Sequence, residues 1–106
     1  HDTYGPIGPY LVTKDEIKDI NNLNMSLDVN DKRMQTGNTN NMIFNVDVIV
    51  SYLSKFMSLQ AGDLITTGTP PGVGMGKKPQ IFLKVGDNMK LHIENLGEQN
   101  SKVVAL

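Results

Sequence analysis

The feature that most constrains the fold is an alternation of apolar and polar residues in the first third of the chain. Apolar side chains occupy every second position over residues 23–29, and this period of two is typical of a β-strand with one buried face. Asn30 and Asp31 follow as a turn, although Asp adopts a positive φ at a higher cost than Gly. Residues 32–37 return as the partner strand. The pattern therefore predicts a β-hairpin.

Further strands are predicted in the second half of the chain, where short apolar runs are separated by turn residues. The expected strands are residues 64–67, residues 81–85, a segment containing Met89, Leu91 and Ile93, and residues 102–106. Gly86-Asp87 and Gly97-Glu98 are expected to form turns between them. The residues at 64–67 are expected to form a short buried strand.

Two helices are predicted before these strands. Thr13 and Glu16 form a capping-box pattern, which favours a short helix that contains Ile17 and Ile20 and ends near Asn21-Asn22. A second helix follows the N-cap candidate Asn45, and its apolar residues at helical spacing are Val46, Ile49, Val50, Leu53, Phe56 and Met57. Such a stripe is far more often core than a cofactor site, so we interpret it as scaffold. The predicted fold class is mainly β with short helices (α+β).

Composition limits the size and the partners of the protein. A chain of 106 residues suffices for one domain or part of one, and its net charge of -1 gives no general attraction to nucleic acid or an anionic membrane. No apolar run approaches the roughly 20 residues that span a bilayer. The absence of cysteine excludes disulfides and thiolate chemistry and fits a cytoplasmic protein. The first residue is His1 rather than Met, so we expect that upstream residues have been removed.

The Gly-rich segment at residues 68–76 is the strongest functional lead. It fails the dinucleotide fingerprint because Lys77 stands where the third glycine is required, and it fails the P-loop pattern because Lys78 follows Gly76-Lys77. Two interpretations stay open: a structural turn, or a ligand loop in which backbone amides and the polar atoms of Thr66, Thr67 and Thr69 face a small molecule.

Other chemical sites find little support. His92 and Glu94 fall on the polar face of a predicted strand, and two ligands on one strand are too few for a metal site. The carboxylates Asp15, Glu16 and Asp19 are explained by the start of a helix, where acids favour the macrodipole. No Gly-x-Ser-x-Gly elbow is present. Covalent acyl transfer therefore has no evident nucleophile.

Several motifs, taken in order, resemble the fumarylacetoacetate hydrolase family. The segment at residues 2–9 resembles the one after the family's active-site lysine. Val29-Asn30 with Gln35 and Thr39 resembles its Asn-Gly-x-x-x-Gln-x-x-x-Thr stretch, and Met42-Ile43-Phe44 follows as expected. The most specific match is the sequence Gly-Asp-Leu-Ile-Thr-Thr-Gly-Thr-Pro-Pro-Gly-Val-Gly at residues 62–74. Asp31 replaces the usual turn glycine, and Met34 stands where arginine is common.

The resemblance implies a fold and a cofactor. The fold would be part of a mixed β-sandwich roll, with residues 1–106 forming the C-terminal part of a single catalytic domain. The family is commonly dimeric and acts on small oxo-acids through Mg²⁺ or Mn²⁺, which, when chelated by carboxylate and keto oxygens, stabilises an enolate. Its metal ligands, two glutamates and an aspartate, and its lysine would all precede His1. No metal ligand is therefore expected in this chain, and the catalytic residues are expected upstream.

The resemblance also assigns roles to residues that are present. Thr69 matches a threonine that contacts the substrate's acid or oxo group, and the Gly68 and Thr69 amides would be additional donors. Asp2, Pro6 and Gly8 would shape the loop of the lysine. Gln35 would be a wall of the site or a hydrogen-bonding scaffold.

The expected function is that of an enzyme segment acting on small 2-oxo or 2-hydroxy-dienoic acids. Hydrolysis, isomerisation and decarboxylation are all found in the family; acylpyruvate hydrolase and 2-hydroxyhepta-2,4-diene-1,7-dioate isomerase are examples. The segment alone is expected to be inactive, because the metal side of the site would be missing. The alternative is a non-catalytic β-rich binding or assembly domain that kept the scaffold. Upstream sequence would distinguish the two.

Overall fold

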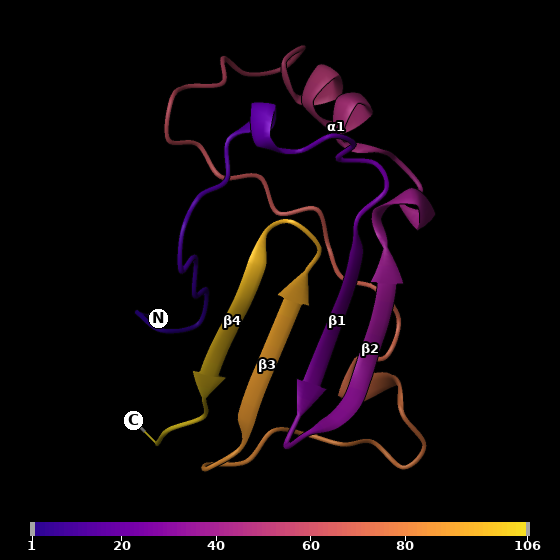
Figure 1. The fold of residues 1–106 in the computed structure, drawn as a ribbon, viewed down its shortest axis with the longest axis vertical. Helices are drawn as coiled ribbons and strands as arrows, with labels where there is room; N and C mark the ends of the chain where they lie inside the picture. Colours follow the sequence, from indigo (N-terminus) through magenta and orange to yellow (C-terminus); the bar gives the residue numbers. More distant parts are fainter. Residues whose placement is uncertain (1, 106) are drawn as a thin grey trace.

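The computed structural model describes residues 2–105, so His1 and the last residue of the predicted strand 102–106 lie outside the described part. The elements in chain order are η1 (Lys14–Glu16), β1 (Asn24–Val29), β2 (Lys32–Asn38), η2 (Thr39–Asn41), α1 (Val46–Leu53), η3 (Gly74–Gly76), β3 (Asn88–Ile93) and β4 (Gly97–Lys102). The four strands form one antiparallel sheet in the order β2-β1-β3-β4 (Figure 1). The mainly β character with short helices is confirmed.

The predicted hairpin is confirmed. β1 pairs with β2 on one side and with β3 on the other, and β2 extends one residue beyond its expected end, to Asn38. Asn30 and Asp31 form the turn with φ of 49° and 62°. Asp31 thus adopts the left-handed conformation in which glycine is commonest, and the hairpin forms despite that substitution.

The last strand begins earlier than predicted. The turn after β3 consists of residues 94–96, where Asn95 has a φ of 62° and the Leu96 N–H donates to the Ile93 carbonyl. The prediction of a turn at Gly97-Glu98 was therefore wrong, since both residues belong to β4. The predicted strand at residues 102–106 was wrong in the described part except at Lys102, where β4 ends. Asn tolerates the left-handed region, so the turn needs no glycine at its centre.

Two predicted strands are absent among the described residues. Residues 64–67 and 81–85 are not assigned to any strand, and Leu64 and Phe82 are 66% and 63% exposed. The expectation of a buried strand at residues 64–67 was therefore wrong. Their apolar composition favoured burial, but no described strand pairs with either segment.

The first predicted helix is reduced to the single 3₁₀ turn η1. The Thr13 hydroxyl donates to the Glu16 carboxylate at 3.3 Å and does not cap a backbone N–H, and Ile17 is already extended. One turn fixes several dihedrals for few hydrogen bonds, so two apolar positions do not sustain a helix here.

The second predicted helix is confirmed at its start. The Asn45 side chain accepts from the Val48 N–H at 2.9 Å, as an N-cap does. α1 ends at Leu53, four residues before the end of the predicted apolar stripe, and the remaining residues form turns. Phe56 is 69% exposed. The stripe is therefore only partly buried by the described residues.

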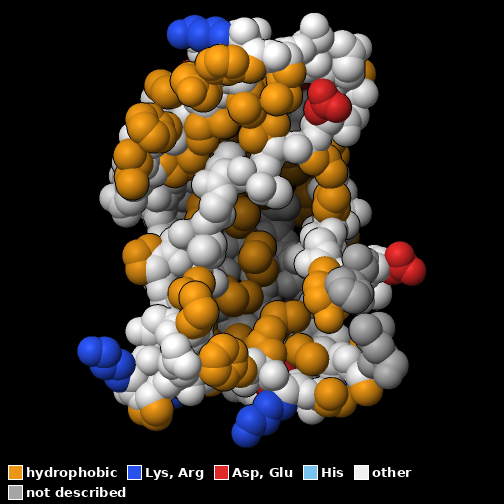
Figure 2. Space-filling view, turned by 180° about the vertical axis from the view of Figure 1, so that it is seen from behind, with side chains coloured by type: hydrophobic (Ala, Val, Ile, Leu, Met, Phe, Trp, Pro, Cys, Tyr) orange, Lys and Arg blue, Asp and Glu red, His pale blue; other side chains and the backbone are white. Residues whose placement is uncertain are grey.

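Few apolar side chains are buried in the described part of the chain. Ile17 and Leu23 are the buried hydrophobic residues, while Phe44, Tyr52 and Phe82 are mostly exposed. α1 lies beyond one end of the sheet, and Figure 2 shows hydrophobic side chains gathered most densely at that end of the rear face, which is hollowed near its middle. None of the helices within residues 2–105 is long and apolar enough to cross a membrane.

Candidate functional site

The Gly-rich loop packs closely against β2. A Cβ added to Gly72 would lie 2.2 Å from the Met34 carbonyl oxygen, and one added to Gly37 would lie 2.7 Å from the Pro70 Cβ. Gly72 also has a φ of +117°, which L side chains rarely adopt. Glycine at both positions therefore allows the backbone of the loop to approach the strand.

Gln35 ties this loop to β2. It is 7% exposed and is the buried polar side chain among the described residues. Its Nε2 lies 2.8 Å from Thr69 Oγ1 and 2.6 Å from the Pro70 carbonyl oxygen. A buried amide costs free energy unless it is hydrogen-bonded, so these two bonds explain how a glutamine is accommodated there.

Gly68 and Thr69 line a hollow of about 610 Å³. Its other residues come from β1, β2, η2, α1 and the adjoining segments, and they are Met25, Thr36, Gly37, Asn38, Thr39, Asn41, Met42, Ile43, Phe44, Ile49, Thr67, Pro70 and Pro71. Thr69 is exposed, and Gly68 has a φ of +89°. Within residues 2–105, no backbone carbonyl accepts from the N–H of Gly68 or Thr69. Two residues that line the hollow therefore carry N–H groups that no described backbone carbonyl occupies.

A second hollow, of about 540 Å³, is lined by a later part of the same loop. Gln35, Gly72 and Gly74 line it together with apolar residues of β1, β3 and the segment at residues 81–83. Gln35 lines this second hollow. Its side chain also bonds to Thr69, which lines the first hollow, so Gln35 lies between the two hollows.

The N-terminal segment is held at the opposite edge of the sheet. Gln99 on β4 donates to the Gly8 carbonyl at 2.7 Å and to that of Pro6 at 3.5 Å, while Asp2 is exposed. Sequence reasoning did not single out Gln99, because a lone polar residue in a short strand carries no recognisable pattern. The structure thus brings Gln35, Gly68 and Thr69 together at β2 and places Pro6 and Gly8 at β4.

Both loops nevertheless lie on one face of the sheet. Gln35, Leu27, Leu91 and Gln99 are successive cross-strand partners, and directly opposed residues of antiparallel strands project from the same face. Three strand spacings, roughly 14 Å, separate the two glutamines. The edge strands therefore hold two loops that flank a common face.

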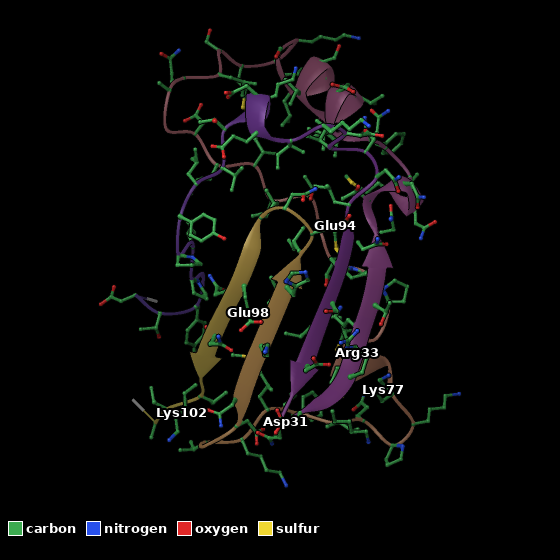
Figure 3. All side chains as sticks on the ribbon, viewed as in Figure 1. Asp31, Arg33, Lys77, Glu94, Glu98 and Lys102 are labelled. Carbon is green, nitrogen blue, oxygen red and sulfur yellow. The ribbon has the colours of Figure 1, made fainter. Side chains whose placement is uncertain are left out.

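The charged groups of the sheet make structural contacts. The hydrogen bond from Arg33 lowers the pKa of Asp28, and hydrogen bonds from Asn100 and Lys90 lower the pKa of Glu98. The Glu94 carboxylate accepts from the Asn24 backbone and side chain at 3.1 and 2.8 Å, at the end of the sheet opposite Asp31 (Figure 3). Within residues 2–105, no three His, Cys, Asp or Glu side chains are grouped so that they could hold a metal ion.

Residues 1–104 match the family described as Fumarylacetoacetate (FAA) hydrolase C-terminal. The chain belongs to the fumarylacetoacetate hydrolase family. The resemblance carried by the Thr-Gly-Thr-Pro loop is thereby confirmed.

Individual members of the fumarylacetoacetate hydrolase family match over nearly the whole chain. The 2,4-didehydro-3-deoxy-L-rhamnonate hydrolase of Sphingomonas sp. (strain SKA58) is 60% identical over 104 residues, which are 97% of this chain and 36% of that protein. The fumarylacetoacetate hydrolase of psychrophilic Exiguobacterium antarcticum superposes with a TM-score of 0.92 at 40% identity, covering 95% of this chain and 36% of the other.

A third match was solved with ligands. The maleylpyruvate hydrolase of Sphingobium sp. SYK-6, in complex with a manganese(II) ion and pyruvate, superposes with a TM-score of 0.85 at 36% identity, covering 93% of this chain and 35% of the other. The chain thus spans about a third of the length of these relatives. The family members with similar structures include both hydrolases and isomerases.

Proposed function

We propose that this chain forms the substrate-side wall of a divalent-metal-dependent enzyme that acts on small 2-oxo or 2-hydroxy-dienoic acids. Thr69 and Gly68 are the proposed substrate contacts. The observation that carries the proposal is the set of donor groups on residues of the hollow: Gly68 and Thr69 line it, no described backbone carbonyl accepts from their N–H groups, and the Thr69 hydroxyl is bonded to the buried Gln35. Convergent donors suit the carboxylate and oxo oxygens of such acids.

The metal belongs to a different part of the proposed site. The described residues contain no group of ligands for Mg²⁺ or Mn²⁺, so they do not fit a metal centre by themselves. We propose that residues 1–106 are the C-terminal part of a single catalytic domain and that the ligands lie upstream of His1 in the longer protein. The manganese(II) ion in the maleylpyruvate hydrolase structure supports a divalent cofactor.

The remaining parts of the proposal follow from family membership. The reaction would be hydrolysis, isomerisation or decarboxylation of the oxo-acid, in a cytoplasmic homodimer without nucleic-acid or membrane partners. Asp2, Pro6 and Gly8 would shape the loop after the active-site lysine, and the bonds from Gln99 to Pro6 and Gly8 show how β4 holds that segment.

Substitution of Thr69 in the full-length protein tests the substrate contact. We expect T69V to raise the KM for oxaloacetate or an acylpyruvate about tenfold to a hundredfold, because a hydrogen bond to a charged group contributes about 1.5–3 kcal/mol. T69S, which keeps the hydroxyl, should retain most of the affinity. T13V serves as the control, since Thr13 is exposed, bonds to the neighbouring acids Glu16 and Asp15, and does not line the hollow. An unchanged KM in T69V would remove Thr69 from the site.

The alternative is a non-catalytic binding or assembly domain that kept the scaffold. It would be favoured if the residues before His1 lack the acidic ligands and the lysine, and if the full-length protein with Mg²⁺ or Mn²⁺ turns over neither oxaloacetate nor acylpyruvates. Turnover by the full-length protein, with none by residues 1–106 alone, would support the enzyme.

A further inference from the structure

The two bonds of Gln35 fix the orientation of its amide. The Pro70 carbonyl oxygen can only accept a hydrogen bond, so the side-chain atom 2.6 Å from it must be the NH₂ group rather than the amide oxygen. The same nitrogen lies 2.8 Å from Thr69 Oγ1. Gln35 therefore donates to Thr69, and the Thr69 hydroxyl accepts at this contact.

The orientation of the Gln35 amide determines which hydrogen bonds remain open to the Thr69 hydroxyl. A hydroxyl has one proton to donate and two lone pairs, and Gln35 occupies one lone pair. Among the described residues, none accepts the Thr69 proton. Because Thr69 is exposed at the 610 Å³ hollow, its proton remains for a ligand atom that accepts.

Gln35 itself has little freedom to turn away. It is 7% exposed, and the position of an added Gly72 Cβ would lie 3.1 Å from its Cγ. Reversing its amide would place the amide oxygen against the Pro70 carbonyl oxygen, and two acceptors would face each other in a buried site. The donor orientation is therefore held by the close approach of the loop to β2.

We propose that Gln35 is a positioning residue that makes Thr69 a hydrogen-bond donor toward the ligand. The site would thereby select molecules that present an acceptor, such as an ionised carboxylate or an oxo oxygen, over molecules that present an N–H in its place. This inference rests on the proposed substrate contact of Thr69. It adds the reason why the Thr69 hydroxyl donates to the ligand rather than accepting from it.

The test measures binding of pyruvate and pyruvamide to the full-length protein with Mn²⁺, by titration calorimetry. Pyruvamide has an NH₂ group where pyruvate has a second carboxylate oxygen. In Q35E, an ionised carboxylate would accept the Thr69 proton and could not donate to Pro70. We expect the dissociation constant for pyruvate to rise about tenfold or more, as for loss of a hydrogen bond to a charged group, and the preference for pyruvate over pyruvamide to shrink.

Two further variants separate positioning from folding. Q35M has a similar length, carries no charge and cannot donate, so it should also weaken pyruvate binding if Q35E does not fold. Q80E is the matched control, because Gln80 is exposed and donates its amide to the Met75 carbonyl at 3.1 Å, outside the Thr69 contact. It should leave both dissociation constants within twofold of the wild-type values.

A double-mutant cycle with T69V tests whether Gln35 affects pyruvate binding through Thr69. If Gln35 acts through Thr69, Q35E should weaken pyruvate binding no further in the T69V background. Two outcomes would overturn the positioning role even if T69V binds pyruvate weakly. One is a double variant in which the losses of pyruvate affinity from Q35E and T69V add in full. The other is an unchanged preference for pyruvate over pyruvamide in Q35E and Q35M. Normal pyruvate binding in T69V would instead overturn the proposed substrate contact of Thr69, on which this inference rests.

Discussion

At the scale of single residues, Gly72 lets the Gly-rich loop pack closely against β2. Its φ of +117° is costly for other residues, and an added Cβ would meet the Met34 carbonyl oxygen at 2.2 Å. Gly62 has a similar φ of +96°, but nothing lies within 4 Å of its Cβ position. A side chain at either of these two glycines would therefore strain the backbone, but of the two only Gly72 would also bring it into a steric clash.

We expect G72A to destabilise the full-length protein more than G62A does. G62A should lower the free energy of unfolding by about 1–2 kcal/mol, the cost of a left-handed conformation for an L residue. G72A should lower it further, because the loop must move away from β2. Urea titrations of both variants provide the comparison, and equal losses would contradict the close packing of the loop against the strand.

The residues of the candidate site could be named from the sequence, but their contacts could not. Thr69 and Gln35 were singled out by resemblance to family motifs, yet they are 34 positions apart. Their bond depends on the path of the chain after α1, which no local pattern specifies. Gln99 was missed for the same reason, since its bond to Gly8 joins residues 91 positions apart.

At the scale of elements, the hairpin was predictable because its partners are adjacent in sequence and joined by two turn-forming residues. The segments at residues 64–67 and 81–85 were predicted as strands from apolar composition alone. A strand also needs a neighbour that pairs with its backbone, and no described strand supplies one. Local pattern therefore predicted β1, β2 and the core of β3, while the start of β4 depended on an Asn turn.

The end of the hairpin is attached to the start of β3 through Asn30. Its side-chain nitrogen donates to the Asp87 carboxylate at 2.8 Å, and its side-chain oxygen accepts from the Asn88 N–H at 3.0 Å. The hydrogen bond from Asn30, followed by that from the Lys84 N–H, lowers the pKa of Asp87. The attachment should therefore depend on pH.

We expect the stabilising effect of Asp87 to disappear in acid. Because its pKa is lowered in the folded state, its contribution is present above the ordinary Asp value of about 3.9 and is lost as the pH falls through the lowered folded value. D87N should thus lower the thermal unfolding midpoint of the full-length protein at pH 7. The difference from wild type should narrow below about pH 4, and a constant difference across this range would contradict the linkage.

At the scale of the whole molecule, the described residues leave much apolar surface uncovered. Exposed side chains occur on α1, on the segment before it and on residues 81–85, and they include Phe44 at 63%, Tyr52 at 60% and Phe82 at 63%. Soluble monomers rarely expose apolar patches larger than a few hundred Å². Since the chain spans about a third of its relatives' length, we propose that the rest of the longer protein covers this surface.

Residues 1–106 produced alone should therefore bind a hydrophobic dye and self-associate, whereas the full-length protein should not expose this surface. The contrast is measurable by ANS fluorescence and by sedimentation velocity at several concentrations. F82K should reduce both effects in the isolated segment, because it places a charge on a side chain that is 63% exposed. N40K, which adds the same charge at an exposed polar position, should change them less. If the isolated segment is monodisperse and binds no dye, the exposed apolar residues need no cover. If F82K and N40K reduce self-association equally, net charge rather than apolar contact controls it.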